Sequence, residues 1–294
     1  MRMSAVTAFL AGVFFVVPSQ ASDASPDLSG AWARRTFAFE LPKSGPGPLN
    51  YSAGYGRGDY ANPILTPMGA AAVRERSELI RQSREYPNPS SKCLPMASPY
   101  IFRVQEVQIL QKKDEVVFLF MQDHQVRRVR LDSRHPAKIT PSWNGDSIGH
   151  YEGDNLVVDS VGFKLGPLPI VDEMSGAPFS ESLHVVERWR LVDYEAAKVA
   201  QENNIRDTRA QLQLPVMGSG TATEQAAFID ETYKGKGLQV TFTVDDPKIF
   251  KMPWSAAVTW RQAGGWVENA CAENTHEYYN NGFTKIPQAD KPDF

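Results

Sequence analysis

The sequence has few cysteines and histidines, and its charges nearly balance. Two Cys and five His occur among 294 residues, with no Cys-x-x-Cys pair and no glycine-rich nucleotide loop. Lysine and arginine number 31 against 34 acidic residues, and the basic residues are scattered along the chain. These absences argue against a redox or metal centre built on sulfur, a nucleotide cofactor and a nucleic-acid partner. We therefore expect no cofactor and no metal.

Long apolar runs are also missing, except near the start of the chain. Residues 1–21 carry one early Arg, an apolar run from Ala5 to Pro18 and a small-residue ending, a pattern typical of a secretory signal cleaved after Ala21. The run is too short for a stable membrane anchor, and no other segment reaches the length of a span. The expectation is a soluble protein exported to the periplasm or the medium.

The two cysteines, Cys93 and Cys271, are predicted to form a disulfide. An even count in an oxidising compartment favours a bridge over the alternative, two buried free thiols. Closing so long a loop would constrain the unfolded chain.

Strand-like segments dominate the sequence and follow one another closely. They are residues 28–39, 104–112, 115–122, 124–131, 147–152, 155–163, 183–192, 238–245, 255–262 and 266–269. Neighbouring strands with little helix between them predict an all-β fold, an antiparallel meander that closes into a barrel.

Helices are expected in only a few places. Thr66-Pro67 is typical of an N-cap and first helical position, so a helix should run from there to about Tyr86. An insertion over about 194–237 should hold a helix at 194–214 and a short one near 224–229. We expect a single domain over 22–284, followed by a flexible tail, 285–294.

Several motifs together carry a resemblance to a known group. They are Asp27-Leu28-Ser29-Gly30-Ala31-Trp32, Leu65-Thr66-Pro67, Cys93-Leu94-Pro95, the segment from Ser147-Ile148-Gly149 to Asp159, the run from Ser182 to Arg188, and the segment from Asp245-Asp246-Pro247 to Pro253-Trp254. This combination resembles a large group of exported bacterial proteins, most of them uncharacterised, and spans most of the chain. The strand pattern is similar to calycin-like barrels, which include lipocalins and several cofactor-free enzymes. The chain departs from the group in the insertion 194–237 and in having His150 where an Arg would be more usual.

The segment 147–160 carries a first pair of candidate catalytic residues. Glu152-Gly153-Asp154-Asn155 predicts a tight hairpin turn, because glycine suits the first central position of a type II′ turn. Pairing Glu152 with Asn155 sets His150 opposite Val157 and Ile148 opposite Asp159. His150 and Asp159 then become diagonal neighbours on one face, either as a structural contact or as an acid–base pair.

The strand 183–192 carries a second pair. His184 shares one face with Arg188 and Arg190, whereas Glu187 lies on the opposite, mainly apolar face with Trp189. If the apolar face points inward, Glu187 needs a buried partner, which Arg103, Arg128 or Arg130 could supply. If instead the basic face lines a cavity, it suits an anionic ligand group. The alternative is an outward charged face with one internal ion pair.

Three other signals favour ordinary structural roles. Gly145-Asp146-Ser147-Ile148-Gly149 matches the spacing of a nucleophile elbow, but a loop precedes it and a strand follows, so we interpret it as a turn into a strand. His184 and Glu187 have the spacing of helical metal ligands, yet on a strand residues three apart point to opposite faces. His135, beside Pro136, is interpreted as a solvated loop residue, with substrate binding as the minority alternative.

Two functions remain open at this stage. Aromatic residues, including Tyr151 and Trp189, are numerous enough to line a cavity for a flat or apolar small molecule, although aromatics are also ordinary core. The first hypothesis is a cofactor-free lyase, isomerase or hydrolase in which His150 or His184 is the general acid or base, oriented by Asp159 or Glu187. Arginines, among them Arg103, Arg128, Arg188 and Arg190, would bind the substrate. The second is a lipocalin-like carrier that binds a small molecule without chemistry.

Overall fold

The computed structural model describes residues 25–36, 38–50, 58–83, 89, 93–103, 106–172, 174–212 and 229–266. The expected signal segment, the expected tail and Cys271 lie outside the described residues. So do most of the short helix expected at 224–229 and of the strand expected at 266–269.

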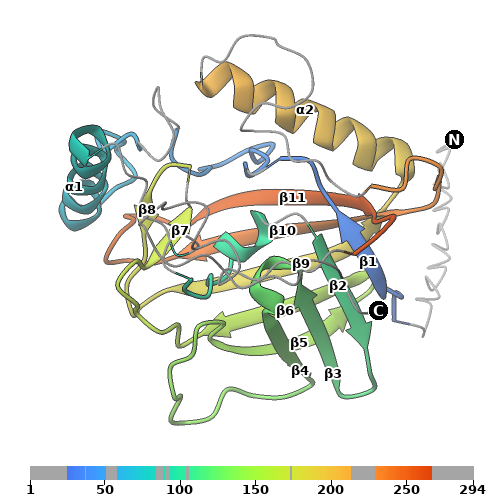
Figure 1. Ribbon diagram of the computed structural model, residues 1–294. Helices are drawn as coiled ribbons and strands as arrows, with labels where there is room; N and C mark the ends of the chain where they lie inside the picture. The colour runs from blue at the N-terminus through green and yellow to red at the C-terminus, as the bar shows by residue number, and fades with distance from the viewer. Residues whose placement is uncertain are drawn as a thin grey trace, which may run out of the picture.

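A closed barrel of nine strands forms the body of the described structure (Figure 1). Its strands, in the order in which they pair around the barrel, are β1 (Gly30–Ala33), β11 (Trp254–Gln262), β10 (Gly237–Asp245), β9 (His184–Val192), β6 (Asn155–Val161), β5 (Asp146–Glu152), β4 (Val126–Leu131), β3 (Glu115–Phe120) and β2 (Glu106–Gln111). β1 also pairs with β2 and thereby closes the ring. The predicted all-β barrel is confirmed, and closure leaves no strand of this ring at an open edge.

One pair of strands departs from the predicted antiparallel meander. β4 and β5 run parallel, with Arg130 beside Ile148 and Leu131 beside Gly149. A two-residue hairpin cannot join parallel strands, so the connection 132–145 must carry the chain back to the start of β5. This connection therefore crosses the outside of the barrel and brings loop residues over β5 and β6.

Aromatic side chains fill much of the barrel interior. Trp189 stacks on Trp260 with 5.5 Å between ring centroids, and it lies 4.8 Å from the ring of Phe118 and 5.3 Å from that of Phe102. All four side chains are almost fully buried. They come from alternate positions of strands and from the short 3₁₀ helix η2 (Tyr100–Arg103), as expected where every second strand residue points inward.

Helix α1 (Pro67–Ser83) begins where the sequence predicts. Thr66 Oγ1 accepts a hydrogen bond from the backbone N–H of Gly69 at 3.1 Å, which is the N-cap contact. α1 packs near the two-stranded sheet of β7 (Ile170–Asp172) and β8 (Ala177–Pro178), which the sequence did not suggest. These elements lie together at one end of the barrel (Figure 1).

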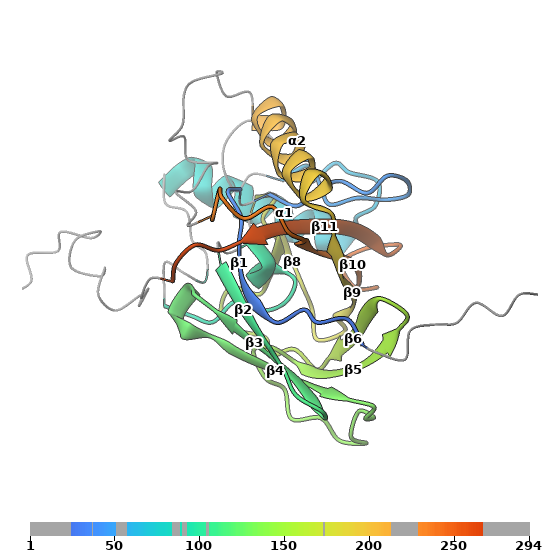
Figure 2. The same ribbon diagram turned by 90° about the vertical axis from the view of Figure 1, so that its right-hand side faces the viewer.

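Helix α2 (Tyr194–Leu212) is the insertion, and it lies across β10 and β11 (Figures 1 and 2). Side-chain amides hold much of its inner face. Gln201 Nε2 donates to the carbonyl oxygens of Ala33 (3.2 Å) and Thr259 (3.1 Å), and Asn204 Nδ2 donates to that of Phe39 (3.0 Å). These bonds satisfy backbone groups that the helix would otherwise bury unpaired. Among the described residues, no helix combines the length and the apolarity needed to cross a membrane.

Candidate functional site

A diagonal row of polar residues crosses the outer face of strands β5, β6 and β9. Ile148 of β5 pairs with Asp159 of β6, and Asp159 pairs with Val186 of β9. Asp146 and His184 each lie two residues from those partners on the same face. Side chains at such diagonal positions are within reach of each other, so the register alone aligns Asp146, Asp159 and His184. With Arg130 and His135 they form a set that we call the outer histidine cluster.

His184 and Asp159 form the contact with the clearest chemical potential in this cluster. The ring nitrogen Nε2 of His184 lies 3.1 Å from both carboxylate oxygens of Asp159. Each side chain is 39 % exposed. A carboxylate can only accept, so Nε2 must carry the proton, and in the neutral ring Nδ1 then has a lone pair available. Nδ1 has no hydrogen-bonding partner among the described residues, which leaves it available for proton exchange.

His135 joins the two carboxylates of the row from the connection 132–145. Its Nδ1 lies 2.6 Å from Oδ1 of Asp146 and its Nε2 lies 3.0 Å from Oδ1 of Asp159. Both ring nitrogens of His135 are therefore engaged with carboxylate oxygens. Arg130 completes the set with a two-point contact to Asp146, at 2.9 and 3.0 Å. His135 therefore positions the carboxylates and has no nitrogen left for a substrate.

The contacts in the cluster shift its pKa values in opposite directions. The hydrogen bond to Asp159 raises the pKa of His184, with partial burial opposing the shift. The same bond, helped by His135, lowers the pKa of Asp159. The hydrogen bond from Arg130 lowers the pKa of Asp146, and His135 adds to it. Charged partners thus favour the ionised form of all three groups.

His150 takes part in a different contact. The predicted hairpin register is confirmed, with His150 opposite Val157 and Ile148 opposite Asp159. The ring of His150, however, lies 2.9 Å from a carboxylate oxygen of Glu152, and the other oxygen of Glu152 accepts a bond from Arg188 at 2.6 Å. His150 and Asp159 share a face, but their expected interaction is replaced by these exposed contacts. Asp159 is instead taken by His184 and His135.

Inside the barrel, Glu187 is paired with Arg127. Two bonds of 3.0 and 2.7 Å join the guanidinium to the carboxylate, and both side chains are fully buried. Arg127 also donates to Ser160 at 2.8 Å and to Ser147 at 3.2 Å. Trp189 Nε1 donates to Glu187 at 2.8 Å. The whole network lies in the core, so Glu187 and Trp189 are core residues and are not part of a surface site.

The prediction that Arg103, Arg128 or Arg130 pairs with Glu187 was wrong. Arg128 and Arg130 point outward, because only alternate residues of β4, Arg127 and Val129, face the core. Arg128 binds Glu115 at 2.7 Å on the surface. Arg103 is buried elsewhere, with its guanidinium 5.4 Å from the ring centre of Tyr100.

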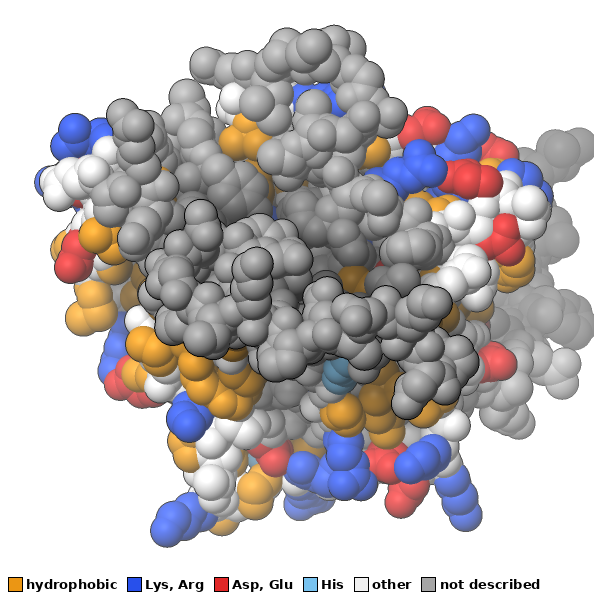
Figure 3. All heavy atoms as spheres, in the orientation of Figure 1, with side chains coloured by type: hydrophobic (Ala, Val, Ile, Leu, Met, Phe, Trp, Pro, Cys, Tyr) orange, Lys and Arg blue, Asp and Glu red, His pale blue; other side chains and the backbone are white. Residues whose placement is uncertain are grey.

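The other predicted binding residues have different partners and do not contact one another. Tyr151 is partly buried, and its hydroxyl accepts a bond from Gln111 at 2.6 Å. Burial raises the pKa of Tyr151. Arg190, which lies two residues after Arg188 on β9, donates to Gln239 at 2.8 Å. Charged groups of both signs are mixed along the lower edge of the molecule in Figure 3.

The geometry also decides the roles of two motifs, the Gly-x-Ser-x-Gly segment and the spacing of His184 and Glu187. Ser147 is buried, and its hydroxyl shares a 2.9 Å hydrogen bond with that of Ser160, so it is no exposed nucleophile. His184 faces outward and Glu187 is buried inside, so the two cannot share a metal ion. Within the described part of the chain, no group of three or more His, Cys, Asp or Glu side chains is arranged to hold a metal.

Sequence reasoning missed Asp146 and Arg127, and it gave His135 a different role. The signal for Asp146 was present, since it alternates with Ile148 and His150 on the strand that carries them. Alternation along the strand could have identified Arg127 as the partner of Glu187, because Arg127 shares a face with the apolar Val129 whereas Arg128 and Arg130 lie on the other face. His135 offered no signal, because a loop residue has no periodicity to follow.

Comparison of the chain with protein-family models, with curated proteins and with solved structures finds no match in any of the three. The site must therefore be interpreted from its own chemistry.

Proposed function

We propose that this protein is an exported, cofactor-free enzyme that moves protons on a small molecule, with His184 as the acid–base group. The observation that supports it is the contact of His184 Nε2 with Asp159, which leaves Nδ1 of a part-exposed ring without a partner among the described residues. A carboxylate behind an imidazole holds the ring in one tautomer and stabilises the imidazolium that forms when Nδ1 accepts a proton. Asp159 is thus a positioning residue.

Proton transfer of the isomerase or lyase kind suits this site better than hydrolysis through a serine. Nδ1 can remove a proton from one substrate atom and return it to another, so the step needs no oxidant or cofactor. Ser147 is buried and cannot act as a nucleophile. Ile148 and Val186, partly exposed and paired with Asp159 from either side, offer an apolar surface for the rest of the substrate. An apolar or aromatic small molecule is therefore the proposed substrate class.

The alternative is a lipocalin-like carrier with its ligand inside the barrel. The described interior holds the stack of Trp189 and Trp260 and the buried pair of Arg127 and Glu187. A carrier needs internal space for its ligand, and these side chains occupy that part of the interior. The carrier is therefore less well supported than the acid–base site of the outer histidine cluster.

The test is untargeted turnover of a metabolite extract by the purified protein, followed by mass spectrometry. We expect wild type and His150→Gln to consume the same compounds and His184→Ala to lose that activity while keeping its fold. A wild-type protein that converts nothing, or a His184→Ala variant as active as wild type, would refute the proposal.

A further inference from the structure

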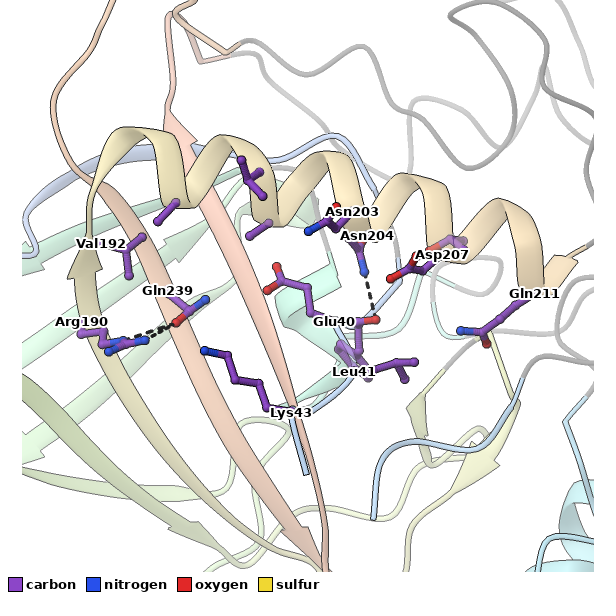
Figure 4. A pocket seen from close by; sticks show the side chains of 15 residues that line it. Glu40, Leu41, Lys43, Arg190, Val192, Asn203, Asn204, Asp207, Gln211 and Gln239 are labelled. Atoms are coloured by element: carbon purple, nitrogen blue, oxygen red, sulfur yellow. Dashed lines mark hydrogen bonds between the residues drawn. The ribbon is translucent and has the colours of Figure 1, made fainter. Parts of the chain in front are cut away.

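A second surface with a built polar interior lies away from the outer histidine cluster. It is a groove of about 480 Å³ between α2, the segment Phe39–Lys43 and the outer side of β9 and β10. We call it the helix groove, and Figure 4 shows it from close by. Its volume is within the range of small-molecule sites, about 300–1,000 Å³.

A directed chain of hydrogen bonds runs along the floor of this groove. Arg190 donates to Gln239 Oε1 at 2.8 Å, and Gln239 Nε2 donates to the hydroxyl of Thr259 at 3.0 Å. Thr259 donates in turn to the carboxylate of Glu40 at 2.9 Å. Each donor uses the acceptor of the next residue, so the chain holds the side chains of Arg190 and Glu40 at two separate points of one groove.

Glu40 provides the negative point. Its backbone pairs with Ala257 in both directions, at 2.8 and 3.0 Å, which holds the residue against β11. Burial under α2 raises the pKa of Glu40, although Arg34 and Thr259 oppose the shift. Burial disfavours the charged carboxylate, and a cationic donor supplied by a ligand, such as an ammonium, would favour that form again.

Lys43 and Arg190 provide the positive point. Figure 4 shows the Lys43 side chain reaching toward Arg190 and Gln239. Lys43 forms no ion pair with any residue that the structure describes. The other acid in the lining, Asp207, forms an exposed ion pair with Arg206 at 3.0 Å. This end of the groove therefore suits a carboxylate.

The walls of the groove add apolar surface beside these charges. Leu41 is 51 % exposed and Val199 is 47 % exposed, and both line the groove. These two side chains offer an apolar contact to a ligand that is held by the charged groups beside them.

We propose that the helix groove binds a small zwitterion of the amino-acid type, with its ammonium on Glu40, its carboxylate on Lys43 and Arg190, and an apolar side chain on Leu41 and Val199. The site is separate from the proposed acid–base site and does not depend on it. It gives a role to the helical insertion, because α2 forms one wall of the groove.

The experiment is calorimetric titration of the full-length exported protein with leucine and with two truncated probes. 3-Methylbutylamine lacks the carboxylate of leucine, and 4-methylpentanoate lacks the ammonium. We expect leucine to bind at least about tenfold more tightly than either probe, because each charged contact is worth a factor of this order. The proposal would be overturned if 3-methylbutylamine bound as tightly as leucine, or if leucine did not bind.

Matched variants assign the contacts. Glu40→Gln keeps the shape and an acceptor for Thr259, and Arg190→Met keeps the length of the stem; each should weaken leucine binding about tenfold or more. Arg188→Met and Glu202→Gln, which change nearby charges outside the groove, should leave it within about twofold. If Glu40→Gln fails to fold, Arg190→Met and Lys43→Met carry the test. Variants of groove residues that bind leucine as wild type does would contradict the assignment, whatever the turnover measured for His184→Ala.

Discussion

Arg127 and Glu187 face each other inside the barrel, joined by two hydrogen bonds of 3.0 and 2.7 Å and fully shielded from water. Ser160 takes a further bond from the guanidinium, and Trp189 gives one to the carboxylate. These hydrogen bonds offset the cost of taking both side chains out of water. Removing one member leaves the other charge buried and unpaired.

Glu187→Leu should therefore destabilise the protein by about 3–5 kcal/mol. The double variant Arg127→Met/Glu187→Leu should recover much of that loss, since no charge then remains buried. Urea unfolding of the two variants measures the difference. Arg128→Met is the matched control, because the Arg128 side chain is exposed and Glu115 keeps a second partner, Lys112. A double variant no more stable than Glu187→Leu would contradict this interpretation.

The contact of His184 with Asp159 should make stability depend on pH. The pKa of His184 is raised above 6.5 in the fold, so its contribution is complete below pH 6.5 and is lost as the pH rises through the higher folded value. The pKa of Asp159 is lowered below 3.8, so its contribution is complete above pH 3.8 and is lost as the pH falls through the lower folded value.

His184→Ala should accordingly lose more stability, relative to wild type, at pH 5.5 than at pH 9. Asp159→Asn should show the same trend, because it removes the other member of the pair. Urea midpoints at the two pH values provide the measurement. A deficit that is equal at both values would mean that the contact does not shift the pKa of His184.

Under the proposed function, Asp159 should affect the rate through His184. Asp159→Asn should lower turnover and move the inflection of the pH–rate profile that belongs to His184 toward 6.5, since the bond that raises the pKa of His184 is weakened. Glu152→Gln is the matched control, and its profile should coincide with that of wild type. An unshifted inflection in Asp159→Asn would leave this carboxylate with a structural role only.

Gly162 should tolerate a side chain poorly. Its φ is +71°, and a Cβ there would lie 2.4 Å from Cγ2 of Ile139 in the connection that carries His135. Gly162→Ala should cost about 1–3 kcal/mol, from overpacking added to the backbone penalty. Gly153→Ala separates the two effects, because Gly153 has a φ of +56° and no atom near the added Cβ. Equal unfolding free energies for the two variants would exclude the contact with Ile139 as the cause.

The disulfide between Cys93 and Cys271 remains a prediction, since Cys271 lies outside the described residues. Thiol titration of the denatured, unreduced protein should detect no reactive thiol. Addition of a reductant should release two. Two thiols before reduction would disprove the bridge.

Local patterns were enough to predict the nine strands of the barrel, the start of α1 and the hairpin of β5 and β6, but not the small sheet of β7 and β8. Thr66-Pro67 sets the helix start through a cap and a fixed φ, both properties of neighbouring residues. Gly153 at positive φ sets the hairpin register, and alternation then determines which residues share a face. The same alternation placed His184 and Glu187 on opposite faces.

The partners of those residues were decided by the tertiary structure. Asp159 meets His184 only because β6 lies beside β9 in the closed barrel, and this pairing joins segments that no local pattern connects. Glu187 meets Arg127 across the interior, and His135 reaches Asp146 because the parallel pairing of β4 and β5 draws the connection over the barrel. Turns and alternation act between near neighbours in the chain. Closure of the barrel selects the contacts between distant ones, and those contacts form the candidate site.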